Sequence, residues 1–311
     1  MTGLRVAVSE YLSIRRAVGF KLDRVEHLLF GFVEYAESQG ATSITSELAL
    51  RWATLPAQAS PGWWQSRLCV VRCFARHMSA LDPSTEVPPT DLLPRSYAGS
   101  ARATPYLYSP AELDALMAAA RSIRSTLTAA TCETLIGLLA VTGMRVGEAL
   151  RLDVNDLDWP LGLVVVRDSK FDRSREVPLH RSTLDALRAY LRVRDQRFAT
   201  PRSPSLFVSR TGGRLSYRTV NWHFVRLVRN AGLQPRSARC RPRLHDFRHL
   251  FACATLEDWY RAGVDVQARL PLLSTYLGHV DPASTYWYLS GKPELLALAA
   301  MRLEASLGTL P

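Results

Sequence analysis

Apolar residues recur every three or four positions over most of the chain, which is the spacing that places them on one face of an α-helix. In the first part of the chain this pattern predicts helices at residues 8–20, 25–40 and 63–81. The periodicity then stops in a stretch rich in Pro, Ser and Ala, which is typical of a linker. We therefore expect a helical domain at 1–87, followed by a linker at 88–105.

The second part of the chain mixes helices with one short hairpin. The segments at 161–170 and 174–179 predict two strands, and the residues between them predict a turn. The helical pattern resumes on both sides of this hairpin, at 109–122, 127–143, 181–198, 217–232, 244–260, 271–278 and 293–308. The sequence thus predicts a mostly α fold with a small β-hairpin, in which a mixed α+β domain at 106–291 precedes a helical tail at 292–311.

Composition places the chain among ordinary globular proteins. Hydrophobic residues make up 47% of it, yet no apolar run approaches the roughly 20 residues that a membrane span requires. The first residues do not resemble a signal peptide, so we expect a cytoplasmic protein without a membrane partner. Five cysteines at scattered positions do not suggest a disulfide framework.

The charge is large and uneven. The formal net charge is +11, and residues 1–100 carry 10 basic and 9 acidic side chains, against 29 and 19 in the rest. A basic surface favours a polyanionic partner such as nucleic acid. A codon bias toward Arg would explain why only three of the 39 basic residues are Lys. It would not explain why acidic residues are scarce between Arg197 and Arg243.

The segment "TGMRVGEALRL" places Arg145 at the expected start of a helix, just after Gly143. A cation at a helix N-terminus opposes the helix dipole, so the position makes sense if Arg145 and the helix both face an anion. The alternative is a local salt bridge to Glu148, three residues further on. The motif alone favours neither.

Lys170 lies in the predicted hairpin, in a chain that almost always uses Arg. A Lys in a turn is usually only solvated. Lys can, however, give up a proton, whereas Arg is effectively always charged. This difference makes Lys170 a candidate proton donor.

Two further segments combine His with other polar groups. In "RLHDFRHLFA", His245 and Arg248 are three residues apart, so both can face one ligand from one side of a helix. In "YLGHVDPASTYWYLSG", His279 is preceded by Tyr276 and followed by Tyr286 and Tyr288. Tyr276 lies before Gly278, within the preceding helix, where a packing role is expected. The plain alternatives are a satisfied polar corner on a helix and ordinary aromatic packing.

A metal site is disfavoured. Cys69, Cys73 and His77 recur every four residues, but no second cluster accompanies them, and we expect them on the core face of their helix. No close acidic cluster suggests a two-metal site for phosphoryl transfer. Neither a metal nor another cofactor is therefore expected.

Taken together, these motifs resemble those of the tyrosine recombinases, the phage integrase family. Its pattern combines Arg in T-G-x-R-x-x-E, Lys in a hairpin, H-x-x-R, and G-H followed by a Tyr nine residues after the His. The resemblance spans residues 106 to about 290, although the segment before Gly-His is a few residues longer here. It implies that 1–87 is a core-binding domain and that the catalytic residues are Arg145, Lys170, His245, Arg248, His279 and Tyr288.

The resemblance also implies the chemistry. Arg145 and Arg248 would bind the nonbridging oxygens of a phosphodiester, and the histidines would add donors or move a proton. Tyr288 would attack, giving a 3′-phosphotyrosyl link, while Lys170 would protonate the leaving 5′ oxygen. Tyr286 is only seven residues after the His and is expected to pack against the domain.

The expected partner is double-stranded DNA with specific recombination sites, with further contacts from Arg173, Arg175, Arg241 and Arg243. We expect self-assembly on DNA, from dimer to tetramer, with the tail at 292–311 contacting a neighbouring subunit. A partner recombinase and a mobile genetic element as host are also expected. The alternatives are DNA relaxation of the type IB topoisomerase kind, a catalytically inactive DNA-binding protein, and a metal-dependent nuclease, for which we find no carboxylates.

Overall fold

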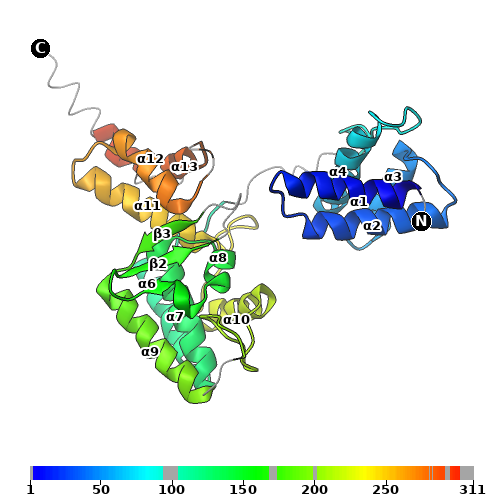
Figure 1. Ribbon diagram of the computed structural model, residues 1–311. Helices are drawn as coiled ribbons and strands as arrows, with labels where there is room; N and C mark the ends of the chain where they lie inside the picture. The colour runs from blue at the N-terminus through cyan, green and yellow to red at the C-terminus, as the bar shows by residue number, and fades with distance from the viewer. Residues whose placement is uncertain are drawn as a thin grey trace, which may run out of the picture. The chain divides into compact units, whose positions relative to one another are not determined.

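The computed structural model describes residues 3–93, 104–167, 174–198, 202–279, 281, 283–290 and 295–301. The chain divides into two compact units, Met1–Arg102 and Ala103–Pro311, which are drawn in Figure 1. In the described parts of both units, no helix combines the length and the apolar character needed to cross a membrane.

Within the described residues, the first unit has the helices α1 (Gly3–Ala17), α2 (Asp23–Ser38), α3 (Ser46–Thr54) and α4 (Pro61–Met78). Three were predicted, whereas α3 was not, because its nine residues give only a short periodic pattern. It begins where the Thr45 side chain accepts a hydrogen bond from the Leu48 backbone N–H. Phe32, Trp52 and Phe74 are buried between the helices and form the centre of this core.

The exposed face of α4 corrects one expectation. Cys69 and Cys73 are exposed, because Leu68, Val71 and Phe74 occupy the buried positions of this helix. The expectation that the cysteines lie on the core face was therefore wrong. Among the described residues, no three His, Cys, Asp or Glu side chains are grouped so that they could hold a metal ion.

The second unit contains most of the predicted helices. Ser109 caps α6 through a capping box with Glu112, and α7 ends at Gly143, the last residue of the helix predicted at 127–143. The helices of this unit are α6 (Pro110–Arg121), α7 (Thr126–Thr142), α8 (Val146–Arg151), α9 (Arg181–Arg197), α10 (Tyr217–Asn230), α11 (Asp246–Arg261), α12 (Val266–Leu277) and α13 (Ala283–Tyr286), with 3-10 turns η1 (Val154–Asp156) and η2 (Trp287–Ser290). Residues 295–301 of the tail are also helical.

A small antiparallel sheet lies beside these helices. Its strands, in spatial order, are β1 (Leu157–Asp158), β2 (Leu163–Val166) and β3 (Arg175–Pro178). β2 and β3 are the predicted hairpin, with Val164 opposite Val177 and both buried, while β1 adds a third strand that the sequence did not predict. The expected turn, with Lys170 and Arg173, lies outside the described residues.

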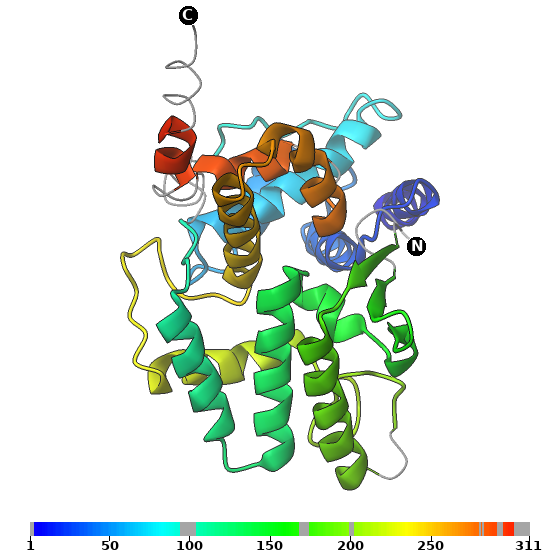
Figure 2. The same ribbon diagram turned by 90° about the vertical axis from the view of Figure 1, so that its left-hand side faces the viewer.

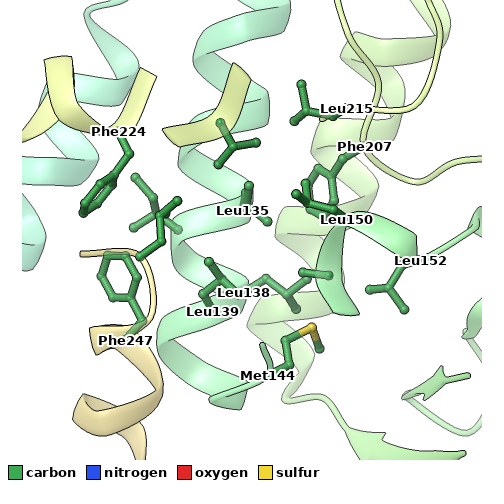
Figure 3. Packing of buried hydrophobic residues seen from close by; sticks show 14 of the residues in the cluster. Leu135, Leu138, Leu139, Met144, Leu150, Leu152, Phe207, Leu215, Phe224 and Phe247 are labelled. Carbon is green, nitrogen blue, oxygen red and sulfur yellow. The ribbon is translucent and has the colours of Figure 1, made fainter. Parts of the chain in front are cut away.

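Helix α7 is the centre of the second unit. It packs against α6, α9, α10 and α11, and its Leu135, Leu138 and Leu139 meet Phe224 of α10 and Phe247 at the start of α11 (Figure 3). Figures 1 and 2 both place α11 and α12 at one end of the unit and α6, α7 and α9 at the other. The mostly α fold with a small sheet is thereby confirmed.

Gly143 is the residue at which α7 ends, beside α11. Its φ angle of +60° is one that residues with a Cβ rarely adopt. A Cβ built there would lie 2.6 Å from Cδ1 of Phe251, so the chain needs glycine for its backbone angle and for the close approach of α11.

We predict that Gly143→Ala lowers the free energy of unfolding by more than the roughly 1 kcal/mol expected for the left-handed angle alone, because the new methyl group also displaces Phe251. Gly232→Ala is the matched control, since Gly232 has a φ of +71° but no atom within 4 Å of its Cβ position. Urea unfolding of both variants measures the difference. Equal losses would show that the contact with Phe251 has no cost.

Candidate functional site

Arg145 lies at the N-terminus of α8, as the sequence predicted. Its Nη1 donates to Oε1 of Glu148 at 2.8 Å, and its Nη2 donates to the carbonyl of Gly278 at 3.3 Å. The local salt bridge considered from the sequence therefore exists. It does not exclude an anion site, because the guanidinium has five N–H groups and the side chain keeps 30% of its exposure.

Glu148 is a buried carboxylate shared by two arginines. Arg175 of β3 donates from Nη2 to Oε2 at 2.7 Å and from Nη1 to Oε1 at 3.3 Å. Burial opposes ionisation of Glu148, but the hydrogen bonds and charge of Arg175, with the help of Arg145, lower its pKa to about 2. The carboxylate is therefore ionised throughout the physiological range.

The position of Arg175 differs from the expected one. Its third nitrogen, Nε, donates to the carbonyl of Tyr276 at 2.8 Å, and its side chain is only 11% exposed. All three nitrogens are thus engaged within the protein, which does not suit the DNA contact that we expected.

Arg248 lies in the first turn of α11 and is buried. Its Nη1 donates to the carbonyl of Gly143 at 3.0 Å and its Nη2 to that of Leu277 at 2.7 Å. Burial, followed by the charge of Arg145, lowers the pKa of Arg248 to about 10, while Tyr288 acts in the opposite direction. Arg248 therefore remains a cation at neutral pH.

Two histidines stand beside these arginines. His279 follows Gly278, which ends α12 in the left-handed conformation, and its Nδ1 lies 2.7 Å from Oγ1 of Thr285. Partial burial, then the charges of Arg248 and Arg145, lower the pKa of His279 to about 4. The pKa of His245, at the N-terminus of α11, is lowered by the same causes. Both are neutral at pH 7 and can accept a proton.

Tyr288 lies among the histidines. It is 3% exposed, with its ring 5.9 Å from that of His279 and 5.2 Å from that of His249. The ring centre of His249 in turn lies 5.2 Å from that of His245. Arg145, His245, Arg248, His279 and Tyr288 are thus brought together from separate segments, whereas Lys170 lies outside the described residues.

The tyrosines near His279 differ in position. Tyr276 stacks on Phe251 with ring centres 5.3 Å apart, which fits the packing role expected for it. Tyr286 is 53% exposed, so the expectation that it packs against the domain was wrong. Thr285 and Tyr286 end α13, and Tyr288 lies in the 3-10 turn η2 that follows. Thr285 and Tyr288, three residues apart, are both buried, whereas Tyr286 between them is exposed.

The remaining expected DNA contacts fall into two groups. Arg241 is exposed, and Arg243 is bound to the buried Asp246 at 2.7 Å while keeping 40% of its exposure. Arg173 lies outside the described residues. Both described arginines are open to a surface ligand, although the guanidinium of Arg243 is also bound to Asp246.

Sequence reasoning missed how the site is held together. Glu148 was considered only as a local partner of Arg145, and Arg175 only as a surface charge. Their pairing joins positions 27 residues apart, and the contact between His249 and Tyr288 joins positions still further apart. No local pattern signals either contact. His249 did carry one weak signal, since it lies one helical turn after His245.

We predict that acid destabilises the wild type more than it destabilises His279→Gln. The folded-state pKa of His279 is about 4, below the 6.5 of a free side chain, so between these values the unfolded chain binds a proton that the folded chain does not. Stability is therefore complete above pH 6.5 and falls as the pH falls toward 4, by about 1 kcal/mol between pH 7 and 5 after solvent screening. Urea unfolding at both pH values measures this difference.

The control is His27→Gln, since His27 is exposed on α2 in the other unit. It should lose as much stability as the wild type between the two pH values. If His279→Gln behaves in the same way, His279 does not carry the predicted proton linkage.

Comparisons with known proteins place the chain in a family. Residues 108–294 match the family described as "Phage integrase family". A Sinorhizobium fredii protein named "Putative integrase/recombinase y4rB" is 45% identical over 310 residues, which cover 98% of each chain. The tyrosine recombinase XerC of Azotobacter vinelandii is 35% identical over 156 residues, 50% of this chain and 46% of that protein.

Solved structures share the fold at low sequence identity. The crystal structure of XerA recombinase covers 98% of both chains with a TM-score of 0.52 at 23% identity. The structure of the Tn1549 transposon integrase covers 98% of this chain and 100% of its own, with a TM-score of 0.64 at 16% identity. The chain therefore belongs to the phage integrase family of tyrosine recombinases, because the family match covers more than half of it and a relative is 45% identical over nearly its whole length.

Proposed function

We propose that this tyrosine recombinase cuts and rejoins double-stranded DNA at specific sites through a covalent 3′-phosphotyrosyl intermediate. The observation that carries the proposal is that two arginines, two neutral histidines and the buried Tyr288 come from separate segments into one site. Such a set binds a phosphodiester, stabilises the charge that develops on it, and supplies a nucleophile.

The two arginines bind the negatively charged phosphate. Attack on phosphorus adds negative charge to the nonbridging oxygens, and guanidinium groups bind such oxygens by paired hydrogen bonds. Arg248 is fixed by two carbonyl groups at 3.0 and 2.7 Å, and Arg145 by a carboxylate and a carbonyl. Both are held before the substrate arrives, so little reorganisation is needed during the reaction.

The histidines and Lys170 have the proton-transfer roles. The Tyr288 oxygen forms the bond to phosphorus while the bond from phosphorus to the 5′ oxygen breaks. Neutral His245 or His279 accepts the tyrosine proton, and Lys170 gives a proton to the leaving 5′ oxygen. The link to Tyr288 keeps the reaction reversible, so a 5′-hydroxyl on another strand can attack it and complete an exchange.

Assembly on DNA is part of the proposal. Structures with the same fold include XerH recombinase bound to its palindromic difH substrate and a lambda integrase tetramer bound to a Holliday junction. In this chain the tail buries Leu295 against its own unit and exposes Leu296 and Met301, at 55% and 65%. These exposed side chains suit a contact with a neighbouring subunit, in a dimer or tetramer formed on DNA.

The biological setting that we propose is a mobile genetic element. The near full-length relative carries the name integrase/recombinase, and a structure with the same fold is the integrase of the Tn1549 transposon. The protein would act on DNA in the cytoplasm, alone or with a partner recombinase.

We predict that Tyr288→Phe binds its target DNA with unchanged affinity and forms no covalent adduct, because the attacking oxygen is removed. Tyr286→Phe is the matched control, since Tyr286 is exposed and lies two residues away; it should keep most of the activity. A suicide substrate that traps the covalent protein, followed by mapping of the linked peptide, measures both. A phosphotyrosyl at 286 or 276 would contradict the assignment of the nucleophile.

We predict that Lys170→Arg slows cleavage strongly while DNA affinity remains near normal, because the charge is kept but an accessible proton is lost. A substrate with sulfur at the 5′ bridging position has a leaving group that needs no proton, so it should restore cleavage by the variant. Failure of this rescue would mean that Lys170 positions the DNA instead.

A further inference from the structure

Arg175 is a buried cation that takes no part in the reaction steps described above. Its guanidinium uses Nη1 and Nη2 on the two oxygens of Glu148 and Nε on the carbonyl of Tyr276. Its side chain also packs against Gly278, where a Cβ would lie 3.0 Å from Nη1. One side chain thus joins β3, the start of α8 and the end of α12.

The charges around Glu148 show what this contact does. Arg145 and Glu148 alone would form a neutral pair, with little net attraction for a phosphate. Because Arg175 adds a second cation to the same carboxylate, the three groups together keep a charge of +1. The ion pairs are largely buried, with side-chain exposures of 2% for Glu148 and 11% for Arg175, so solvent screens them weakly.

The geometry points in the same direction. Arg175 donates to both oxygens of Glu148, whereas the guanidinium of Arg145 donates only to Oε1. The other oxygen, Oε2, accepts from Nη2 of Arg175 and from the backbone N–H of Arg145. If Arg175 were removed, both oxygens could accept from the guanidinium of Arg145, which would turn it away from a substrate. Gly278, held between the two arginines, is the residue before His279.

We propose that Arg175 is a positioning residue for strand transfer: it occupies Glu148 so that Arg145 stays aimed at the phosphate, and it does not touch DNA. This inference rests on the proposed function, because it assigns Arg145 to the phosphate.

The test separates binding from chemistry. Arg175→Met keeps the length of the side chain and removes its donors, and it should leave DNA affinity within about 2-fold with an unchanged salt dependence, since no phosphate contact is lost. The single-turnover rate of covalent adduct formation at saturating DNA should fall roughly 10- to 100-fold, as expected for a misplaced catalytic group. Arg241→Met is the matched control at an exposed arginine. It should reduce the slope of log affinity against log salt by about 1, which is the result expected when one phosphate contact is lost.

A second substitution distinguishes positioning from a merely structural role. In Arg175→Met, Glu148→Gln removes the charge that would capture Arg145, so the double variant should react faster than Arg175→Met alone. Arg175→Lys keeps a cation beside Glu148, so its rate of adduct formation should fall less than that of Arg175→Met. If Arg175→Met does not fold, Arg175→Lys is compared with its own double variant with Glu148→Gln.

The outcomes are distinct. A salt slope that falls in Arg175→Met as it does in Arg241→Met would overturn the proposal in favour of a DNA contact. A double variant slower than Arg175→Met would overturn it in favour of a structural role. A wild type that forms no adduct overturns the proposed function itself, whereas a reactive wild type with equally reactive Arg175 variants overturns only the role of Arg175.

Discussion

The arginines of the site are held by carbonyl groups that two helices leave unpaired at their C-terminal ends. α7 ends at Gly143, whose carbonyl binds Arg248, and the end of α12 supplies carbonyls to Arg248, Arg145 and Arg175. The C-terminal end of a helix carries partial negative charge and favours cations. Each helix turns away at a glycine in the left-handed conformation, which leaves these carbonyls accessible. The helix ends therefore place the arginines before any substrate is bound.

This arrangement explains a position that looks unfavourable in the sequence alone. Arg145 lies at the N-terminus of α8, where the helix dipole opposes a cation. The helix has only six residues, and Arg145 also reaches the carbonyl of Gly278 and the carboxylate of Glu148. These contacts, rather than its own helix, stabilise the charge.

The same charges determine the protonation of the histidines. Arg248 and Arg145 lower the pKa of both His245 and His279, beyond what burial does. A bound phosphate would offset part of this positive charge and make each histidine a better proton acceptor at the moment when a proton must move. Binding of the phosphate charge and proton transfer are thus coupled through the arginines.

The sequence by itself determined the local features of this protein. Helical periodicity, the capping box at Ser109 and the glycine that ends α7 depend on residues within a few positions of one another, and so did the short motifs that contain Arg145, Arg248 and His279. Tertiary structure decided the rest. The burial of Arg175 against Glu148 depends on a contact between β3 and α8. The burial of Tyr288, beside the exposed Tyr286, depends on the packing of η2 against α11. Neither can be predicted from local spacing, because an arginine or a tyrosine has the same local pattern whether its partner is solvent or a segment far along the chain.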